Sequence, residues 1–152
     1  MSSGRNICII CAVVICVFLS FPLLALADEA STTSQIIGQV DDILKANPLP
    51  TGEKSQMIKI AEDDTISFFL IRMMPGAELP AHIHKTHDET EYVVRGSGQL
   101  LVNDKWVEFK AECVHFNPTK KVHGARNTGD EPLIVLVIFT PAMRETDRHF
   151  LK

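Results

Sequence analysis

The feature that most constrains this chain is a histidine-rich stretch between Gly76 and Gly96. His82 and His84 are one residue apart, so both point the same way if the backbone is extended, because strand side chains alternate between faces. Glu89 follows after a short polar connection that can turn the chain back beside them. Imidazole and carboxylate groups on neighbouring strands make a site for a divalent first-row metal. The stretch therefore predicts a metal site that the rest of the chain must frame and complete.

The N-terminus has the pattern of an export signal. An almost uncharged apolar run covers residues 7–27 behind Arg5, and it ends in Ala25-Leu26-Ala27 followed by two acidic residues. A positive start, an apolar body and a small-x-small cleavage site are typical of a secretory signal peptide. The run is also about long enough to span a bilayer, so an uncleaved anchor, with the domain outside the cytoplasm, is the alternative. We expect cleavage after Ala27 and an exported protein, periplasmic or secreted, that contacts a membrane only through residues 7–27 if they are retained.

Length, charge and cysteine usage limit what the remaining chain can be. The 152 residues suffice for one hydrophobic core, and the net charge of −4 gives no basic surface of the kind that nucleic-acid binding requires. Cleavage removes three of the four cysteines and leaves Cys113, so the exported domain is held together by packing and not by an intramolecular disulfide. Cys113 lies in an apolar run, where we expect a small buried residue and not a reactive thiol.

The periodicity of apolar residues predicts one helix followed by strands. Helical spacing between Ser34 and Ala46 predicts an amphipathic helix that Ser34 caps and Asn47-Pro48 ends. Beyond a stiff linker, short strand-like stretches alternate with turn residues, at 56–61, 65–74, 92–94, 99–102, 106–109, 113–116, 122–126 and 133–139. This organisation predicts an all-β fold, a sandwich or a barrel. The stretch 133–139 is apolar at every residue, so we expect both of its faces to be covered, and the charged residues 144–152 to form a solvated arm.

The histidine stretch resembles the first motif of the cupin superfamily, specifically of its small single-domain members. That motif reads G-x5-H-x-H-x(3,4)-E-x6-G, and the chain matches every fixed position with Gly76, His82, His84, Glu89 and Gly96. The second cupin motif, P-x-G-x2-H-x3-N, is matched by Pro118, His123 and Asn127, with Lys120 in place of the glycine. Glycine there would permit a positive φ, so the lysine leaves the conformation of this turn open. The resemblance covers about residues 55–141.

The resemblance implies a fold, a ligand set and an oligomeric state. The fold is a double-stranded β-helix (cupin, or jelly-roll) barrel at 53–141, after the signal peptide at 1–27 and an N-terminal helix and linker at 28–52, and before a charged C-terminal arm at 142–152. One divalent metal ion inside the barrel is held by His82, His84, Glu89 and His123, and barrels pair into a homodimer. Three imidazoles and one carboxylate do not choose among Fe, Mn, Ni, Cu and Zn.

Nearby polar residues are weaker candidates, each with two interpretations. Glu91 is a solvated edge carboxylate, or else an alternative ligand or acid/base group. His87 is an exposed loop residue, or it closes over the mouth of the barrel. His115 is a satisfied core histidine or a functional one, and Tyr92 packs or offers its hydroxyl to a substrate. We expect the charged arm to keep His149 away from the site.

A fold of this kind does not by itself set the function. The first interpretation is a small metalloenzyme that acts on a small-molecule substrate, by oxygenase, isomerase or lyase chemistry, because the donor set leaves coordination positions open. The second is a non-catalytic, metal-dependent module that binds a sugar-like or anionic ligand. The third is a structural or partner-binding barrel. No second convincing catalytic residue stands out, so the sequence leaves open whether the protein is an enzyme.

Overall fold

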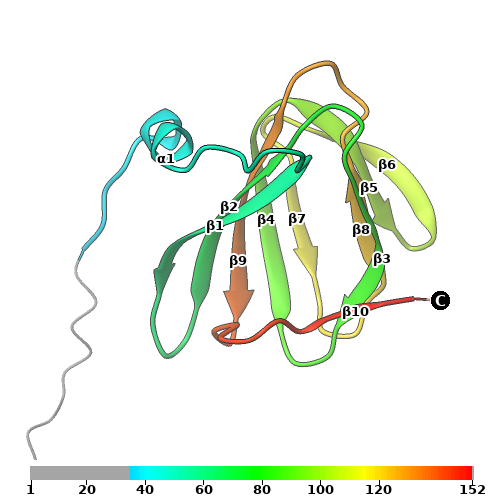
Figure 1. The fold of residues 1–152 in the computed structure, drawn as a ribbon. Helices are drawn as coiled ribbons and strands as arrows, with labels where there is room; N and C mark the ends of the chain where they lie inside the picture. The colour runs from blue at the N-terminus through cyan, green and yellow to red at the C-terminus, as the bar shows by residue number, and fades with distance from the viewer. Residues whose placement is uncertain (1–34, 152) are drawn as a thin grey trace, which may run out of the picture. The chain divides into compact units, whose positions relative to one another are not determined.

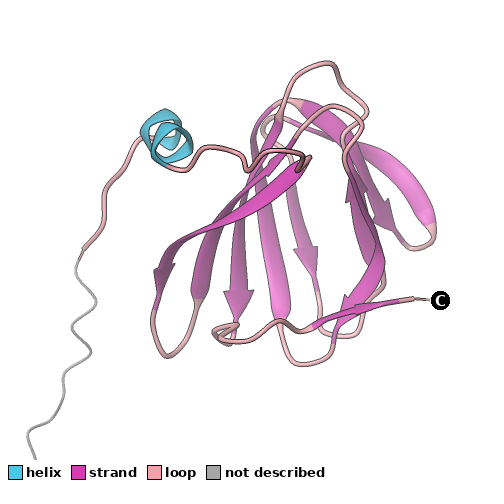
Figure 2. Ribbon diagram, viewed as in Figure 1, coloured by secondary structure: helices cyan, strands magenta, loops and turns pink. Residues whose placement is uncertain are grey.

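The computed structural model describes residues 35–151, which form ten strands and one short helix (Figures 1 and 2). The expected signal peptide at 1–27 and the capping residue Ser34 lie outside this range. Within it, no helix has the length and apolar character needed to cross a membrane. In chain order the elements are α1 Val40–Ala46, β1 Ser55–Glu62, β2 Ser67–Met73, β3 Glu78–His84, β4 Asp88–Arg95, β5 Ser97–Val102, β6 Lys105–Lys110, β7 Val114–Asn117, β8 His123–Arg126, β9 Leu133–Thr140 and β10 Arg148–Phe150.

The strands form two five-stranded antiparallel sheets that face each other (Figure 1). The helix-side sheet has the order β1-β2-β9-β4-β7, and the histidine-bearing sheet has the order β10-β3-β8-β5-β6. Several neighbours, such as β4 with β9 and β3 with β8, are far apart in the sequence. The predicted all-β fold with one N-terminal helix is confirmed.

The hydrophobic core lies between the sheets, and β9 runs through its middle. Leu133, Val135, Val137 and Phe139 belong to the inner cluster, whereas Ile134 on the other face belongs to a second cluster that includes Leu44 of α1. Both faces of β9 are therefore covered, as its uninterrupted apolar sequence predicts. The site described below borders the inner cluster.

The helix is shorter than the periodicity predicts. Residues 35–39 are not helical, and α1 has seven residues. Ile37 is 98% exposed, whereas Val40, Ile43 and Leu44 pack on the sheet. Because short helices are stabilised mainly by packing of their apolar face, the part without such contacts does not continue the helix.

Two tight turns show how local sequence fixes the register near the site. Asn103 and Asp104, with φ of 49° and 62°, join β5 to β6 in a two-residue hairpin of the kind that twisted strands favour. Lys120 has a φ of 67°, so it adopts the left-handed conformation of the glycine in the cupin motif. The Lys120 N–H donates to the main-chain oxygen of His84 at 2.6 Å, which ties this turn to the end of β3.

The C-terminal segment is not the solvated arm that its charge suggests. Its last residues form β10, which pairs with β3 and places Arg148 opposite His84 and Phe150 opposite His82. The Leu151 N–H continues this pairing by donating to the oxygen of Ala81 at 3.0 Å. Without β10, β3 would be an edge strand with unpaired main-chain groups. We call residues 147–151 the C-terminal strap.

Candidate metal centre

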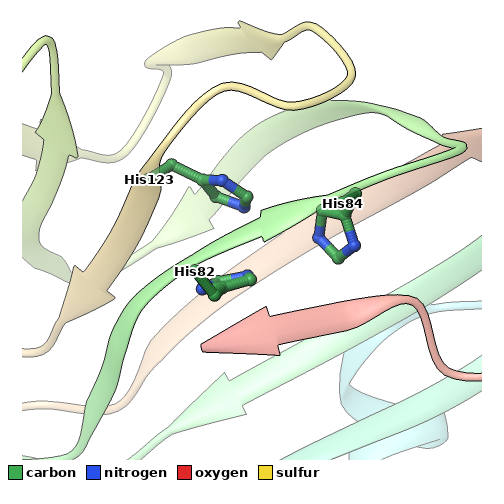
Figure 3. A group of neighbouring side chains, drawn as sticks. All are labelled: His82, His84 and His123. Atoms are coloured by element: carbon green, nitrogen blue, oxygen red, sulfur yellow. The ribbon is translucent and has the colours of Figure 1, made fainter. Parts of the chain in front are cut away.

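Three buried histidines converge between the two sheets (Figure 3), and a buried glutamate lies beside two of them. His82 and His84 lie on β3, and His123 begins β8 directly opposite His82, while Glu89 lies on β4 of the facing sheet. One ring nitrogen of each histidine lies within 4.8 Å of the other two. Oε2 of Glu89 is 2.7 Å from Nε2 of His123 and 3.4 Å from Nε2 of His84. The structure thus brings together the three histidines that the motifs identified, and it places Glu89 against His84 and His123.

Close approach of β8 to β3 sets the position of His123. The register of this pair shifts between Leu79 and His82, and Gly124 lies against the shifted segment. A Cβ at Gly124 would lie 2.9 Å from the oxygen of Leu79 and 3.2 Å from the nitrogen of Ala81. Such contacts are with backbone atoms that cannot easily move, so glycine is required for His123 to reach its neighbours.

A main-chain oxygen orients each imidazole on the side away from the centre. The pairs join the histidine Nδ1 to a carbonyl oxygen: His82 to Pro80 at 2.8 Å, His84 to Asp147 at 3.1 Å, and His123 to Lys121 at 3.2 Å. A carbonyl oxygen only accepts, so these contacts favour a proton on Nδ1 and a free lone pair on Nε2. The side-chain amide nitrogen of Asn117 also lies 2.8 Å from Nδ1 of His123. A proton on this Nδ1 therefore requires the Asn117 amide to be turned so that its oxygen, and not its nitrogen, faces the ring. Histidines that bind metals are typically fixed in this way.

The atoms that face the centre lie close to one another but form no hydrogen bond of good geometry. Nε2 of His84, Nε2 of His123 and Oε2 of Glu89 are closed to water, and none has a hydrogen bond of good geometry among residues 35–151. An unpartnered buried polar atom costs about 1–3 kcal/mol, so converging lone pairs of this kind favour a bound cation. Neutral imidazoles and a carboxylate fit a divalent first-row metal ion, and an ion that prefers six ligands would keep open positions.

Burial and mutual contacts set the charge of the centre. Burial lowers the pKa of His82 to about 4, and a positive charge on His123 acts in the same direction. Burial would raise the pKa of Glu89, but contacts with His123 and His84 lower it overall. Burial would lower the pKa of His123, but the contact with Glu89 raises it overall. Without a metal ion, Glu89 therefore stabilises a proton on His123. A bound metal ion would take the place of that proton.

A second carboxyl group lies beside the first. Glu91, two residues along β4, is only 6% exposed, and its Oε2 is 2.7 Å from Nδ1 of His115 on β7. Burial and the charge of Glu89 raise the pKa of Glu91. The interpretation of Glu91 as a solvated edge carboxylate is therefore wrong, because β4 lies between β9 and β7 and its inward face is closed. His115 is the partly buried partner of this carboxyl group.

Three other candidates lie away from the centre. His87 is buried and not exposed, because the strap covers it and Oδ2 of Asp147 lies 2.8 Å from its Nδ1. Tyr92 neither packs in the core nor faces the site, since it is 41% exposed and pairs with exposed Val114 on the outer face. His149 is exposed and contacts Asp147, so the arm folds back without bringing this histidine to the site.

The C-terminal strap contributes residues that the sequence did not reveal. The main-chain oxygen of Asp147 holds His84 across 63 residues of sequence, and the ring of Phe150 lies 5.8 Å from that of His82. Arg148 lies between them on the strand that runs beside β3, drawn in red next to the three rings in Figure 3. The only local signal is the alternation in Arg148-His149-Phe150, which is too short to predict a strand or its partner.

A small cavity borders the centre on the side of the hydrophobic core. A cavity of about 20 Å³ is lined by Glu89, Glu91 and His123 on one side and by apolar core residues, among them Leu100, Phe109 and Val135, on the other. This volume accommodates about one water molecule. A ligand that reaches the interior in this conformation must therefore be small.

Comparison with known proteins places the chain among cupins. The sequence model of the family described as Cupin domain matches residues 69–139. The chain is 36% identical over 90 residues to an uncharacterised protein of Aquifex aeolicus, covering 59% of this chain and 72% of that protein. It is 31% identical over 80 residues to the oxalate decarboxylase OxdC of Bacillus subtilis, covering 49% of this chain and only 21% of that protein.

A solved structure agrees with the fold. An uncharacterised conserved protein of Klebsiella pneumoniae with a double-stranded β-helix domain superposes with a TM-score of 0.66 at 22% identity. The match covers 78% of this chain and 100% of that one. At this identity the likeness supports the double-stranded β-helix architecture alone, and that architecture confirms the fold that the motifs implied.

Proposed function

This chain belongs to the cupin domain family, and from that membership we propose that it is a small, exported metalloenzyme acting on a small-molecule substrate. The proposed ligands of its one divalent ion are His82, His84, Glu89 and His123. The observation that carries the proposal is the convergence of buried imidazole nitrogens and a carboxylate oxygen that form no hydrogen bond of good geometry. Export is proposed from the apolar run at residues 7–27, and a homodimer stays a prediction from the resemblance.

The chain's own residues support catalysis in distinct ways. The carbonyl oxygens of Pro80, Asp147 and Lys121 hold the rings in place, and the apolar wall of the cavity limits water. A bound divalent ion would polarise a small molecule as a Lewis acid. Glu91 lines the cavity, and its carboxyl group, held through Oε2 by Nδ1 of His115, can hold or release a proton. This second carboxyl group favours an enzyme over a module that only binds its ligand, and the name of the Bacillus subtilis relative agrees.

Metal analysis of the purified full chain tests the centre. We expect near-stoichiometric Fe, Mn, Ni, Cu or Zn in the wild-type protein and its loss in a His82→Ala, His84→Ala double variant. His149→Ala is the matched control, because this histidine is exposed and lies outside the centre, and it should keep the metal content unchanged. Iron or copper would point to oxygen chemistry, and zinc to lyase, isomerase or hydrolytic chemistry.

Two outcomes would contradict the proposal. Absence of metal from the wild-type chain, even after reconstitution with each of the five ions, would remove the metal-based function. Metal binding without turnover of any small carboxylate or sugar in a metal-dependent assay would favour the binding module instead.

A further inference from the structure

We propose that Arg148 makes the centre selective for small carboxylate anions, and that the C-terminal strap is one wall of the ligand site. The inference deepens the proposed function and rests on the metal centre described above. It is carried by the placement of Arg148, by its lack of partners, and by the charge of its surroundings.

The pairing of β10 with β3 places Arg148 on the inner face of the histidine-bearing sheet. Arg148 is directly opposite His84, and Phe150 is directly opposite His82. Residues opposite each other in an antiparallel pair project from the same face of a sheet. The ring centroids of Phe150 and His82 are 5.8 Å apart, which is consistent with Phe150 and His82 projecting from the same face of the sheet. Arg148 therefore projects toward the side on which the histidines converge.

The guanidinium of Arg148 has no partner in the described part of the chain. Its Nε is closed to water without a hydrogen bond, and no carboxylate of residues 35–151 lies within ion-pair distance. Every other arginine in this range has a side-chain or main-chain partner: Arg72 with Asn47 and Gln56, Arg95 with Asp41, Arg126 with Gln99, and Arg144 with Asp64. Buried polar groups are normally paired, so an unpaired arginine at a ligand site indicates that the ligand supplies the partner.

The charge around Arg148 favours an anion. Its positive charge is near enough to lower the pKa of His82, after the larger effects of burial and of His123. Burial lowers the pKa of Arg148 itself, and Glu89 only partly opposes this. With a divalent ion bound, the carboxylates of Glu89 and Glu91 together cannot neutralise the ion and Arg148. The centre then keeps at least one net positive charge, which an anionic ligand would balance.

The planar guanidinium of Arg148 suits a carboxylate ligand. Its planar N–H groups match the two oxygens of a carboxylate, and such paired hydrogen bonds are stronger than neutral ones. A ligand with one oxygen toward the metal and another toward Arg148 uses both positive groups.

Calorimetric titration of the metal-loaded full chain tests the inference. The probes are oxalate, inorganic phosphate and imidazole, the last as a neutral metal ligand. We expect Arg148→Gln to weaken oxalate binding by about 10-fold or more, the loss typical of a charged hydrogen bond, while metal content and imidazole affinity stay unchanged. Arg148→Lys keeps the positive charge but not the planar pair of N–H donors, so it should retain part of the oxalate affinity. It also replaces Arg148→Gln as the test variant if Arg148→Gln fails to fold. Arg144→Gln removes the same charge from an exposed position near the strap and should change nothing.

The outcomes separate this inference from the proposed function. Metal analysis before each titration shows whether the centre exists, and a metal-free wild-type chain would overturn both proposals. A metal-loaded Arg148→Gln variant with wild-type oxalate affinity would overturn the role of Arg148 alone. Phosphate bound more tightly than oxalate, and lost in Arg148→Gln, would overturn the assignment to carboxylates.

Discussion

At the scale of single residues, the contact between Glu89 and His123 links metal binding to protons. Their Oε2 and Nε2 atoms are 2.7 Å apart, and the pKa of His123 is raised despite its burial because Glu89 lies beside it. A ligand imidazole must be neutral. A metal ion therefore has to displace the proton that Glu89 stabilises on His123.

We expect metal affinity to fall as the pH is lowered through the raised pKa of His123. Above that pKa the imidazole is neutral and binds, whereas below it the imidazolium is held by Glu89. His82, with a pKa of about 4, stays neutral across this range and does not contribute. Competition with a chelator between about pH 5.5 and 8.5 should show a slope of up to one proton released per metal ion.

Glu89→Gln tests the cause of that dependence. It keeps the shape of the side chain but removes the charge that raises the pKa of His123. We expect weaker binding overall and a pH dependence displaced to lower pH. An affinity of the wild-type chain that stays constant over this range would contradict the linkage.

At the scale of elements, the strap is attached to the β3–β4 connection by a single carboxylate. Asp147 accepts hydrogen bonds from the N–H and hydroxyl of Thr86, both at 2.8 Å, and from Nδ1 of His87 at 2.8 Å. Burial would raise the pKa of Asp147, but these contacts lower it well below its usual range. The charged carboxylate thus stabilises the attachment of β10 to β3, and with it the carbonyl oxygen that orients His84.

We expect Asp147→Asn to lower the free energy of unfolding by about 1–3 kcal/mol at neutral pH, the cost of losing charged hydrogen bonds. Because the folded-state pKa is depressed, the stabilisation is present above the unfolded value near 3.8 and is lost as pH falls below it. Urea unfolding should therefore give a lower free energy of unfolding for Asp147→Asn than for the wild-type chain at pH 7. In acid the two values should converge. Asp64→Asn, at an exposed partner of Arg144, should have almost no effect, and an equal loss there would contradict the role of Asp147.

Local spacing predicted most elements and the grouping of His82, His84 and Glu89, whereas His123 was implied by the cupin resemblance and the long-range strand pairing was hidden. His82, His84 and Glu89 are close in sequence, and the turn before His123 keeps its shape with a lysine. The burial of His87 and Glu91 depends instead on strap residues and on strands that are distant in sequence. The periodicity at residues 34–39 was misleading, because Ile36 and Ile37 have the spacing of a packed helix but remain largely exposed.

At the scale of the whole molecule, the centre joins the two sheets. His82, His84 and His123 come from the histidine-bearing sheet, and Glu89 comes from β4 of the helix-side sheet. An ion held by all four would connect the layers near the fully buried Phe139, whose ring lies 5.2 Å from that of His84. Binding to the folded chain alone then stabilises the entire domain.

We expect metal to raise the melting temperature by on the order of 10 °C when the free ion is at about 1,000 times its dissociation constant, which corresponds to about 4 kcal/mol. Differential scanning calorimetry with and without a chelator measures the shift. The His82→Ala, His84→Ala variant should show no shift, and His149→Ala should show the full one. A wild-type chain that loses its ion to the chelator without a change in melting temperature would contradict a connecting role.

The groups that orient the three imidazoles are main-chain oxygens, and this has a consequence for genetics. Substitution changes a side chain, so most replacements at Lys121 leave the carbonyl oxygen in place. A library of point variants would identify the four convergent residues but would seldom reveal the carbonyl oxygens that orient the imidazoles. An alignment of sequences has the same limitation, since any amino acid at these positions supplies the same oxygen. Single-residue insertions or deletions around Pro80, Lys121 and the strap would expose that support, because they move the backbone itself.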